Sequence, residues 1–258
     1  MLKWRVVVTT APREESTLRP CLHSLVAAGW KPDCITVCAE PDSQLTSGFE
    51  YIVHTKKLGL WHNWLFSARH ALLSDASVIM TVQDDALFHP DSKELAESLL
   101  WPSKDTGILS LYTAKHYSRH ALYAGDAPGM FQRVNTQGLW GALAWVFPPP
   151  RLQEIITHRI AKSWQGFNNK QRGSDIVNLD SAVGKILNAL ELQLWLLHPS
   201  PVKHIAKHST VGQGSNLGRR NCYGCADHTK PLRPQIFPQH VDHNELRRLE
   251  AIERLAGR

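Results

Sequence analysis

The sequence predicts an open α/β sheet with helices on both faces. Short apolar, β-branched runs alternate with segments of helical periodicity in the order β-α-β-β-α-β, which is typical of such sheets. The 258 residues are 43% hydrophobic and 20% charged, an ordinary globular composition. That composition excludes a disordered, collagen-like or coiled-coil protein. The length suits one large core with a small appendage, so we expect a catalytic or binding domain over residues 1–210 and a basic extension over 211–258.

The first half of the chain predicts four strands and two helices. Residues 5–10 are β-branched and read as a buried parallel strand. Ser16 or Thr17 can cap the helix that follows, because apolar residues from Leu18 to Val26 recur on one helical face and Gly29 ends the pattern. The remaining elements are strands over residues 35–39, 51–54 and 78–82, with a helix over 61–72 before the last of these.

The second half is less regular. Asp91 or Ser92 can cap a short helix to residue 100, and residues 108–112 return as a strand. Residues 114–137 show no periodicity, and an aperiodic stretch of that length in a compact domain is usually functional. The remaining predicted elements are a strand over 140–147, a proline-initiated helix through 160, a helix over 180–190, a strand over 193–197 and a terminal amphipathic helix over 246–255.

Charge and cysteine content indicate the compartment and a class of partner. The formal net charge is +6, and the residues from 203 onward hold ten Lys or Arg against five Asp or Glu. This asymmetry favours a polyanionic partner on that side. Five cysteines give no disulfide framework, and we find no secretory signal and no apolar run long enough to span a membrane. We therefore expect a cytoplasmic protein, in the host cytoplasm if a phage encodes it.

Two adjacent carboxylates follow an apolar strand. Gln83, Asp84 and Asp85 come directly after residues 78–82. Ligands of open α/β sheets bind beyond the carboxyl ends of the strands, where paired carboxylates can hold a divalent cation and a phosphorylated ligand. Asp pairs also begin loops for purely local reasons. The sequence thus leaves both a metal site and turn residues open.

The order of motifs along residues 3–210 resembles the GT-A-fold glycosyltransferases that use nucleotide sugars, particularly the family-2-like ones. The resemblance depends on residues 6–13, VVVTTAPR; on residues 58–70, LGLWHNWLFSARH; and on the Asp pair. Downstream it depends on residues 140–145, WGALAW; on residues 174–180, SDIVNLD; and on residues 199–210, PSPVKHIAKHST. The family often has an acidic residue where Gln83 stands, which implies a site with two carboxylates and a histidine.

The resemblance implies roles for particular residues. It implies Mn²⁺ or Mg²⁺ as the metal and a UDP-sugar as the donor, because a cation that bridges pyrophosphate oxygens stabilises the leaving nucleoside diphosphate. Asp85 and His204 would ligate the metal. The residues expected around the nucleotide are Thr9, Arg13, Glu40, Arg69 and Asp84.

A carboxylate is also needed to take the proton of the acceptor hydroxyl, which would invert the anomeric centre of a transferred hexose. The acidic segment of residues 174–180 is similar to the one that supplies this base in the family. Asp180 is the first candidate and Asp175 the second. Asp180 also stands where a helix is expected to begin, so helix capping is the alternative.

The extension holds a second constellation. Cys222 and Cys225 form a C-x-x-C pair with His228 close behind. Tetrahedral zinc takes four nitrogen or sulfur ligands, so a structural Zn²⁺ is one interpretation and two reduced thiols are the other.

Three functions fit these observations. The leading hypothesis is a metal-dependent glycosyltransferase. A nucleotidyltransferase also uses carboxylate-bound metal, but it usually needs a glycine-rich phosphate loop, and residues 9–13 contain no glycine. The third is a non-enzymatic, basic nucleic-acid-binding protein.

For the acceptor, the basic residues beyond His204 suit a phosphate backbone. The segment 59–64 looks like that of phage enzymes that glycosylate hydroxymethylpyrimidines in DNA, including the group associated with TET-type oxygenases. We therefore expect hydroxymethylcytosine in DNA as acceptor, with a surface glycan or lipid-linked sugar as the alternative.

Overall fold

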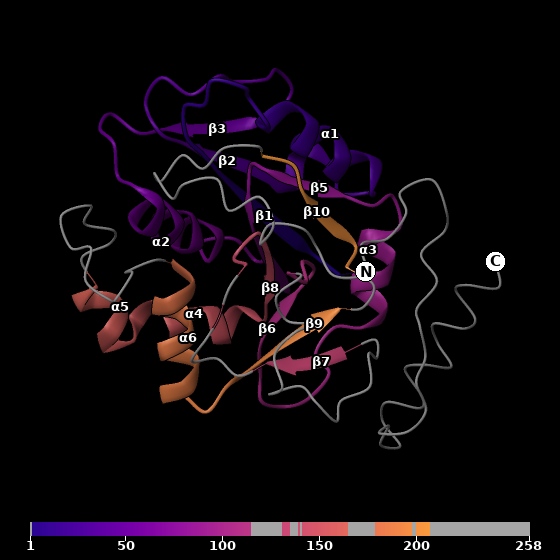
Figure 1. Cartoon of the computed structure of the whole chain (residues 1–258), viewed down its shortest axis with the longest axis vertical. Helices are drawn as coiled ribbons and strands as arrows, with labels where there is room; N and C mark the ends of the chain where they lie inside the picture. Colours follow the sequence, from indigo (N-terminus) through magenta and orange to yellow (C-terminus); the bar gives the residue numbers. More distant parts are fainter. Residues whose placement is uncertain are drawn as a thin grey trace.

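A computed structural model describes residues 2–114, 131–134, 139, 141–164, 179–197 and 200–206, with backbone alone for 131–134. The terminal helix expected over 246–255 and the boundary at residue 210 lie outside these ranges. In the described ranges an eight-stranded mixed sheet forms the centre of the molecule (Figure 1). Its strands are β1 (Trp4–Thr10), β2 (Ile35–Ala39), β3 (Glu50–Val53), β4 (Val78–Gln83), β6 (Thr106–Ser110), β7 (Phe131–Val134), β8 (Ala144–Phe147) and β9 (Gln193–Leu197).

The strand order is β3-β2-β1-β4-β8-β6-β9-β7. The strands β3, β2, β1 and β4 are parallel, β8 is antiparallel to both of its neighbours, and β7 is antiparallel to β9. The parallel half therefore ends at one edge of the sheet, and β8 begins at that same edge. This brings the loops after four strands and the start of a fifth together.

Helices cover both faces of the sheet, as predicted. One face carries α1 (Leu18–Ala27) and α3 (Ser92–Ser98), and Lys93 of α3 lies close to Gly29, which follows α1. The other carries α2 (Leu60–Ala71), α4 (Pro149–Thr157), α5 (Arg159–Ser163) and α6 (Leu179–Ala189). No helix among the described residues is long and apolar enough to cross a membrane.

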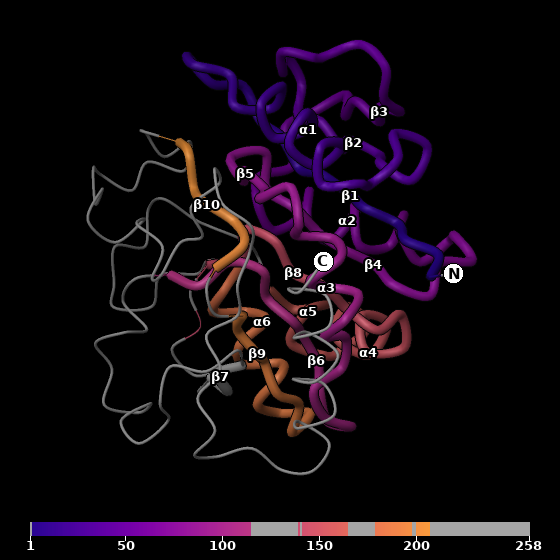
Figure 2. Tube along the Cα trace, turned by 90° about the vertical axis from the view of Figure 1, so that its right-hand side faces the viewer, coloured from indigo at the N-terminus to yellow at the C-terminus, as the bar shows by residue number. Residues whose placement is uncertain are grey.

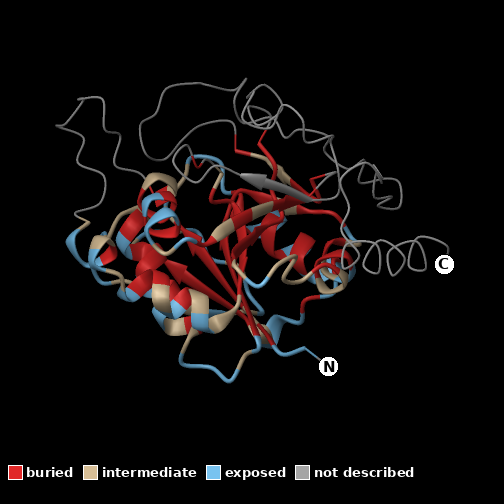
Figure 3. Ribbon diagram, turned by 90° about the horizontal axis from the view of Figure 1, so that it is seen from below, coloured by how far each residue is buried: buried red, intermediate tan, exposed pale blue. Residues whose placement is uncertain are grey.

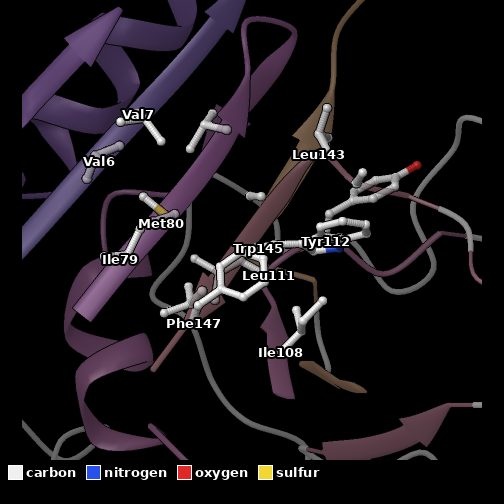
Figure 4. Packing of buried hydrophobic residues seen from close by; sticks show 14 of the residues in the cluster. Val6, Val7, Ile79, Met80, Ile108, Leu111, Tyr112, Leu143, Trp145 and Phe147 are labelled. Carbon is white, nitrogen blue, oxygen red and sulfur yellow. The ribbon is translucent and has the colours of Figure 1, made fainter. Parts of the chain in front are cut away.

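The core lies between the sheet and these helices. The inner strands β1, β2, β4, β6 and β8 are buried along nearly their whole length, whereas the outer surfaces of the helices are exposed (Figure 3). Figure 4 shows how Val6, Met80 and Trp145 from neighbouring strands pack in one continuous cluster. Because the strands are apolar on both faces, the polar groups of the chain gather at the ends of strands.

A second, two-stranded sheet was not predicted. It pairs β5 (Ala86–Phe88) with β10 (Val202–His204) antiparallel, so that His204 lies opposite Ala86. Figure 2 shows β10 beside β5, at the edge where the parallel strands end. Three-residue strands are too short to leave a periodic signal in the sequence. The pairing brings a late segment of the chain next to the loop after β4.

Other elements differ from the predictions in detail. The strand expected over 140–147 begins only at Ala144, and the helix expected through 160 divides at His158, whose backbone is extended. The aperiodic stretch 114–137 contains β7, which the sequence pattern did not indicate. Thr17 precedes α1 as expected, but its side chain makes no capping hydrogen bond.

Candidate active site

Polar side chains converge at the edge where β1, β2 and β4 end. Arg13 follows β1, Glu40 follows β2, and Asp84 and Asp85 follow β4. All four lie in loops that parallel pairing brings to one edge. The backbone continues this convergence, since the N–H of Asp84 donates to the carbonyl of Thr9 at 3.1 Å. These four side chains therefore lie at the same edge of the sheet, and their role as a ligand site stays a prediction.

Asp84 is held by three side-chain bonds. Its Oδ1 accepts from Arg13 Nη2 at 2.6 Å, and its Oδ2 accepts from Arg13 Nε at 3.2 Å and from Thr10 Oγ1 at 2.6 Å. The residue is only 2% exposed. Burial raises the pKa of Asp84 to about 6, although the guanidinium of Arg13 acts in the opposite direction. A carboxylate fixed on both oxygens is a rigid element of the site rather than a free ligand.

Asp85 is bound on one oxygen only. Its Oδ2 accepts from Arg13 Nη2 at 3.0 Å and lies 3.3 Å from His204 Nε2. Its Oδ1 is buried and has no hydrogen-bond partner among the described residues. Such an atom is costly unless something polar or charged completes it. The β5–β10 pairing fixes the arrangement, because the N–H of Ile205 donates to the carbonyl of Asp85 at 2.9 Å.

The pair formed by Asp85 and His204 fits a divalent cation. Two ligands at neighbouring corners of an octahedron, each about 2.1 Å from the ion, lie about 3 Å apart, close to the observed 3.3 Å. Carboxylate and imidazole together suit Mn²⁺. Within the described residues no group of three or more His, Cys, Asp and Glu side chains is arranged to hold a metal ion. The described part of the chain therefore offers two ligands, and phosphate oxygens or water would supply the rest.

Two residues expected near the nucleotide hold the loops instead. Glu40 is 3% exposed, and its two oxygens accept from the backbone N–H groups of Leu58 and Gly59 at 2.8 and 2.7 Å. The hydroxyl of Thr9 donates to the carbonyl of Val82 at 3.3 Å. Glu40 thus joins the loop after β2 to the start of α2. Each of its oxygens accepts one backbone N–H, so the carboxylate fixes the position of one loop relative to the other.

The structure does not bring Arg69 to this edge. Arg69 is exposed in the last turn of α2, a helix that begins beside Glu40 and runs back along the sheet. Its neighbour His70 lies 3.0 Å from Arg5, near the start of β1. About nine residues of helix separate Arg69 from the site, roughly 14 Å at 1.5 Å per residue. The helical periodicity of the sequence shows on which face of the helix a residue lies. It does not show which end of the sheet that residue is near, so the position of Arg69 could not be predicted.

Asp180, the first candidate for the base, lies in the first turn of α6 beside the segment that leads into β8. Its Oδ2 and Oδ1 accept from the backbone N–H groups of Gly141 and Ala142 at 3.1 and 3.0 Å. Burial raises the pKa of Asp180 to about 6, and these two hydrogen bonds limit the rise. Among the described residues, the N–H groups that donate to this carboxylate lie in the segment before β8 and not in α6. A carboxylate oxygen has two lone pairs, so each keeps one for a further proton or donor.

Several predicted residues lie outside the described ranges: Asp175, the second candidate for the base, and the possible zinc ligands Cys222, Cys225 and His228. The described cysteines, Cys21, Cys34 and Cys38, are reduced. Sequence reasoning missed Thr10 and Gly141. Thr10 ends a β-branched strand, and such a position gives no signal for a functional hydroxyl. Gly141 stands just before a strand, where a glycine often indicates unusual backbone geometry, and its φ is +100°.

The sheet and the helices that cover it have the architecture of the GT-A glycosyltransferase fold. The structure is similar to that of GalNAc-T7 with UDP, GalNAc and Mn²⁺, with a TM-score of 0.57, 12% identity, and coverage of 83% of this chain and 44% of that one. It is also similar to the mannosyltransferase PcManGT of Pyrobaculum calidifontis in complex with GDP-Man and Mn²⁺, with a TM-score of 0.50, 15% identity, and coverage of 83% and 59%.

The chain thus spans about half the length of these two proteins. No protein-family model matches the sequence, and none of the curated proteins matches it either. At these identities the likeness establishes the fold. The prediction of a GT-A-like α/β fold is therefore confirmed.

Proposed function

We propose that this chain is a metal-dependent glycosyltransferase that moves a sugar from a UDP-sugar to a hydroxyl acceptor. The observation that carries the proposal is the 3.3 Å approach of His204 Nε2 to Asp85 Oδ2 at the carboxyl end of β4. The two residues are far apart in the sequence and meet where ligands of open α/β sheets bind. The two similar structures, which hold Mn²⁺ with UDP or GDP-mannose, support the same chemistry here.

The charged side chains of the candidate site suggest how the donor would be bound. A bound Mn²⁺ or Mg²⁺ would act as a Lewis acid on the pyrophosphate of the donor, with Asp85 and His204 as its protein ligands. Arg13 supplies a guanidinium fork of the geometry that phosphate oxygens accept in pairs. Asp84 keeps that fork at the site through two hydrogen bonds. Thr9 and Glu40 hold the surrounding loops and thereby preorganise the nucleotide cleft.

The acceptor half needs a base, for which Asp180 is our first choice and Asp175 our second. A pKa of about 6 leaves Asp180 ionised at neutral pH and still able to take a proton from a hydroxyl. Gly141 and Ala142, which donate to Asp180, precede β8, and the neighbour of β8, strand β4, leads into Asp84. Direct proton removal by this carboxylate predicts transfer of a hexose with inversion.

Calorimetry with UDP in the presence and absence of Mn²⁺ tests the donor assignment. We expect UDP binding to require the metal and to disappear in Asp85→Ala. A basic nucleic-acid-binding protein would instead bind DNA and show no metal-dependent UDP binding. Equal UDP affinity with and without Mn²⁺ would contradict the proposal.

For the acceptor we propose hydroxymethylcytosine in DNA. The support is the excess of Lys and Arg from residue 203 onward, since cationic side chains are what a phosphate backbone selects. Surface glycans and lipid-linked sugars remain the competing acceptors. Incubation of hydroxymethylated duplex DNA with UDP-sugars and Mn²⁺, followed by nucleoside mass analysis, distinguishes them. A sugar mass on the base supports DNA, and transfer to carbohydrate or lipid alone contradicts it.

A further inference from the structure

Arg13 bridges the two carboxylates of the site. Its Nε and Nη2 bind both oxygens of Asp84, and the same Nη2 binds Asp85 Oδ2 at 3.0 Å. The three side chains are nearly buried, with exposed fractions of 11% for Arg13, 4% for Asp84 and 6% for Asp85. The guanidinium thus contacts both carboxylates of the candidate site.

The electrostatic reason for this bridge is the proximity of two buried carboxylates. Adjacent desolvated negative charges repel each other strongly unless a cation compensates them. The guanidinium of arginine is always protonated in proteins, so Arg13 brings a permanent positive charge within 2.6 Å of Asp84 and 3.0 Å of Asp85. Arg13 therefore supplies the positive charge that a metal ion would otherwise provide.

This arrangement opposes a second cation. A divalent ion at Asp85 and His204 would share the Asp85 carboxylate with Arg13 Nη2, which lies 3.0 Å from Oδ2. Two positive charges on one carboxylate raise the free energy of the metal-bound site. A diphosphate relieves this repulsion, because its oxygens accept both the metal and the guanidinium fork.

We infer that Arg13 makes metal binding depend on diphosphate binding. In the empty protein it neutralises Asp84 and Asp85 and weakens the affinity for the metal. When metal and diphosphate bind together, the guanidinium of Arg13 turns from Asp85 to the phosphate oxygens, while Nε of Arg13 stays bound to Asp84. The inference rests on the proposed function for the identity of the natural diphosphate, but not for the competition between Arg13 and a cation.

Mn²⁺ binding in solution tests the inference without any measurement of transfer. Free Mn²⁺ is measured by electron paramagnetic resonance in titrations of the wild-type chain, Arg13→Gln and Arg13→Lys, each with and without UDP. Coupling between two ligands is typically 5- to 150-fold in affinity. We expect UDP to strengthen Mn²⁺ binding to the wild type within about that range. Arg13→Gln should bind Mn²⁺ at least about fivefold more tightly than the wild type without UDP and should lose most of the coupling.

Two further variants serve as controls, one for the charge of Arg13 and one for the loss of a buried arginine elsewhere in the chain. Arg13→Lys keeps the charge but not the fork, so it should retain weak metal binding in the absence of UDP and show reduced coupling. Arg5→Gln is the matched control, because Arg5 is also largely buried and ion-paired, with Glu50 at 2.8 Å, but at the opposite end of β1. It should leave both quantities unchanged.

The outcomes separate this inference from the donor assignment. If Arg13→Gln and the wild type bind Mn²⁺ with the same affinity without UDP, or neither binds it, the inference is wrong. If UDP has no effect on Mn²⁺ binding to the wild type, the donor assignment fails. The inference is then tested by two measurements. The first compares the Mn²⁺ affinities of the wild type and Arg13→Gln without UDP, and the second repeats the titrations with inorganic pyrophosphate in place of UDP.

Discussion

Asp180 Oδ2 accepts a hydrogen bond of 3.1 Å from the backbone N–H of Gly141. The bond joins the start of α6 to the segment before β8, and a second bond to Ala142 completes the clamp. Gly141 is suited to this position because its φ is +100°, in the left-handed region that L side chains rarely adopt. The candidate base is therefore also a structural clamp, and the first predictions separate the two roles.

Asp180→Asn should lower the turnover number by about 10²- to 10⁴-fold, the usual contribution of a general base. UDP affinity in the presence of Mn²⁺ should stay within about twofold, because the nucleotide loops are unchanged and the removed group acts only in the transition state. Steady-state kinetics and calorimetry measure the two quantities. An equal loss of turnover and affinity would show that Asp180 acts only as a clamp, since the amide can accept just one of the two N–H donors.

The protonation of Asp180 should also appear in stability. Its pKa rises from 3.8 in the unfolded chain to about 6 in the folded one. The folded state therefore binds this proton more tightly, and the associated stabilisation is complete below about pH 4 and lost as the pH rises through 6. Between these values the unfolding free energy of the wild type should fall relative to that of Asp180→Asn. Urea unfolding of both proteins from pH 4 to 7 measures the difference, and a constant difference would contradict the raised pKa.

Gly141→Ala should destabilise the fold by about 1–3 kcal/mol, through backbone strain and crowding. A Cβ at this position would lie 3.0 Å from Tyr112 Cδ1. Gly48→Ala is the matched control, because Gly48 has a similar φ of +91° and nothing within 4 Å of the added Cβ. Urea unfolding should show a larger loss for Gly141→Ala than for Gly48→Ala. Equal losses would mean that Tyr112 accommodates the methyl group without cost.

Glu40→Gln should reduce stability by about 1–3 kcal/mol, because the amide nitrogen would face an N–H group that the carboxylate now accepts. Glu50→Gln is the control, since the Glu50 side chain is 54% exposed and pairs with Arg5. That change should cost about 1 kcal/mol or less. Thermal unfolding compares the two variants. Loss of UDP affinity with full stability in Glu40→Gln would instead indicate direct nucleotide binding.

Asp85→Ala should abolish Mn²⁺-dependent UDP binding and transfer while leaving the fold intact. The backbone bond from Ile205 to Asp85 persists, and Arg13 keeps its two bonds to Asp84. Arg69→Ala, at the far end of α2, should bind UDP like the wild type. Calorimetry and circular dichroism provide the measurements, and normal transfer by Asp85→Ala with Mn²⁺ would refute the metal assignment.

The parallel half of the fold was predictable because its strands are buried on both faces. Residues 5–10, 35–39 and 78–82 are rich in β-branched residues, and strands β1, β2 and β4 match these ranges within a residue at each end. The location of Asp84 and Asp85 follows directly, since a polar pair after a buried strand must lie at its end. Periodicity and turn chemistry are local properties, and this part of the site depends on them alone.

The contacts made by distant segments were not predictable in the same way. Neither the pairing of β10 with β5 nor the clamp of Asp180 on Gly141 leaves a periodic trace in the sequence. His204 was identified only through resemblance to a family, and its 3.3 Å approach to Asp85 is a property of the folded chain. Arg13 was expected at the nucleotide, but its two carboxylate partners depend on side-chain geometry that spacing does not contain.

Because of the β5–β10 pairing, the candidate site contains residues from both halves of the chain. The arginine and the two carboxylates belong to the first 85 residues, whereas the imidazole comes from the last described strand. During synthesis on the ribosome, a chain that has emerged only as far as β9 contains the acidic pair and its guanidinium without the histidine. Competence to hold a cation between Asp85 and His204 therefore arrives late, when residues 202–204 dock on residues 86–88.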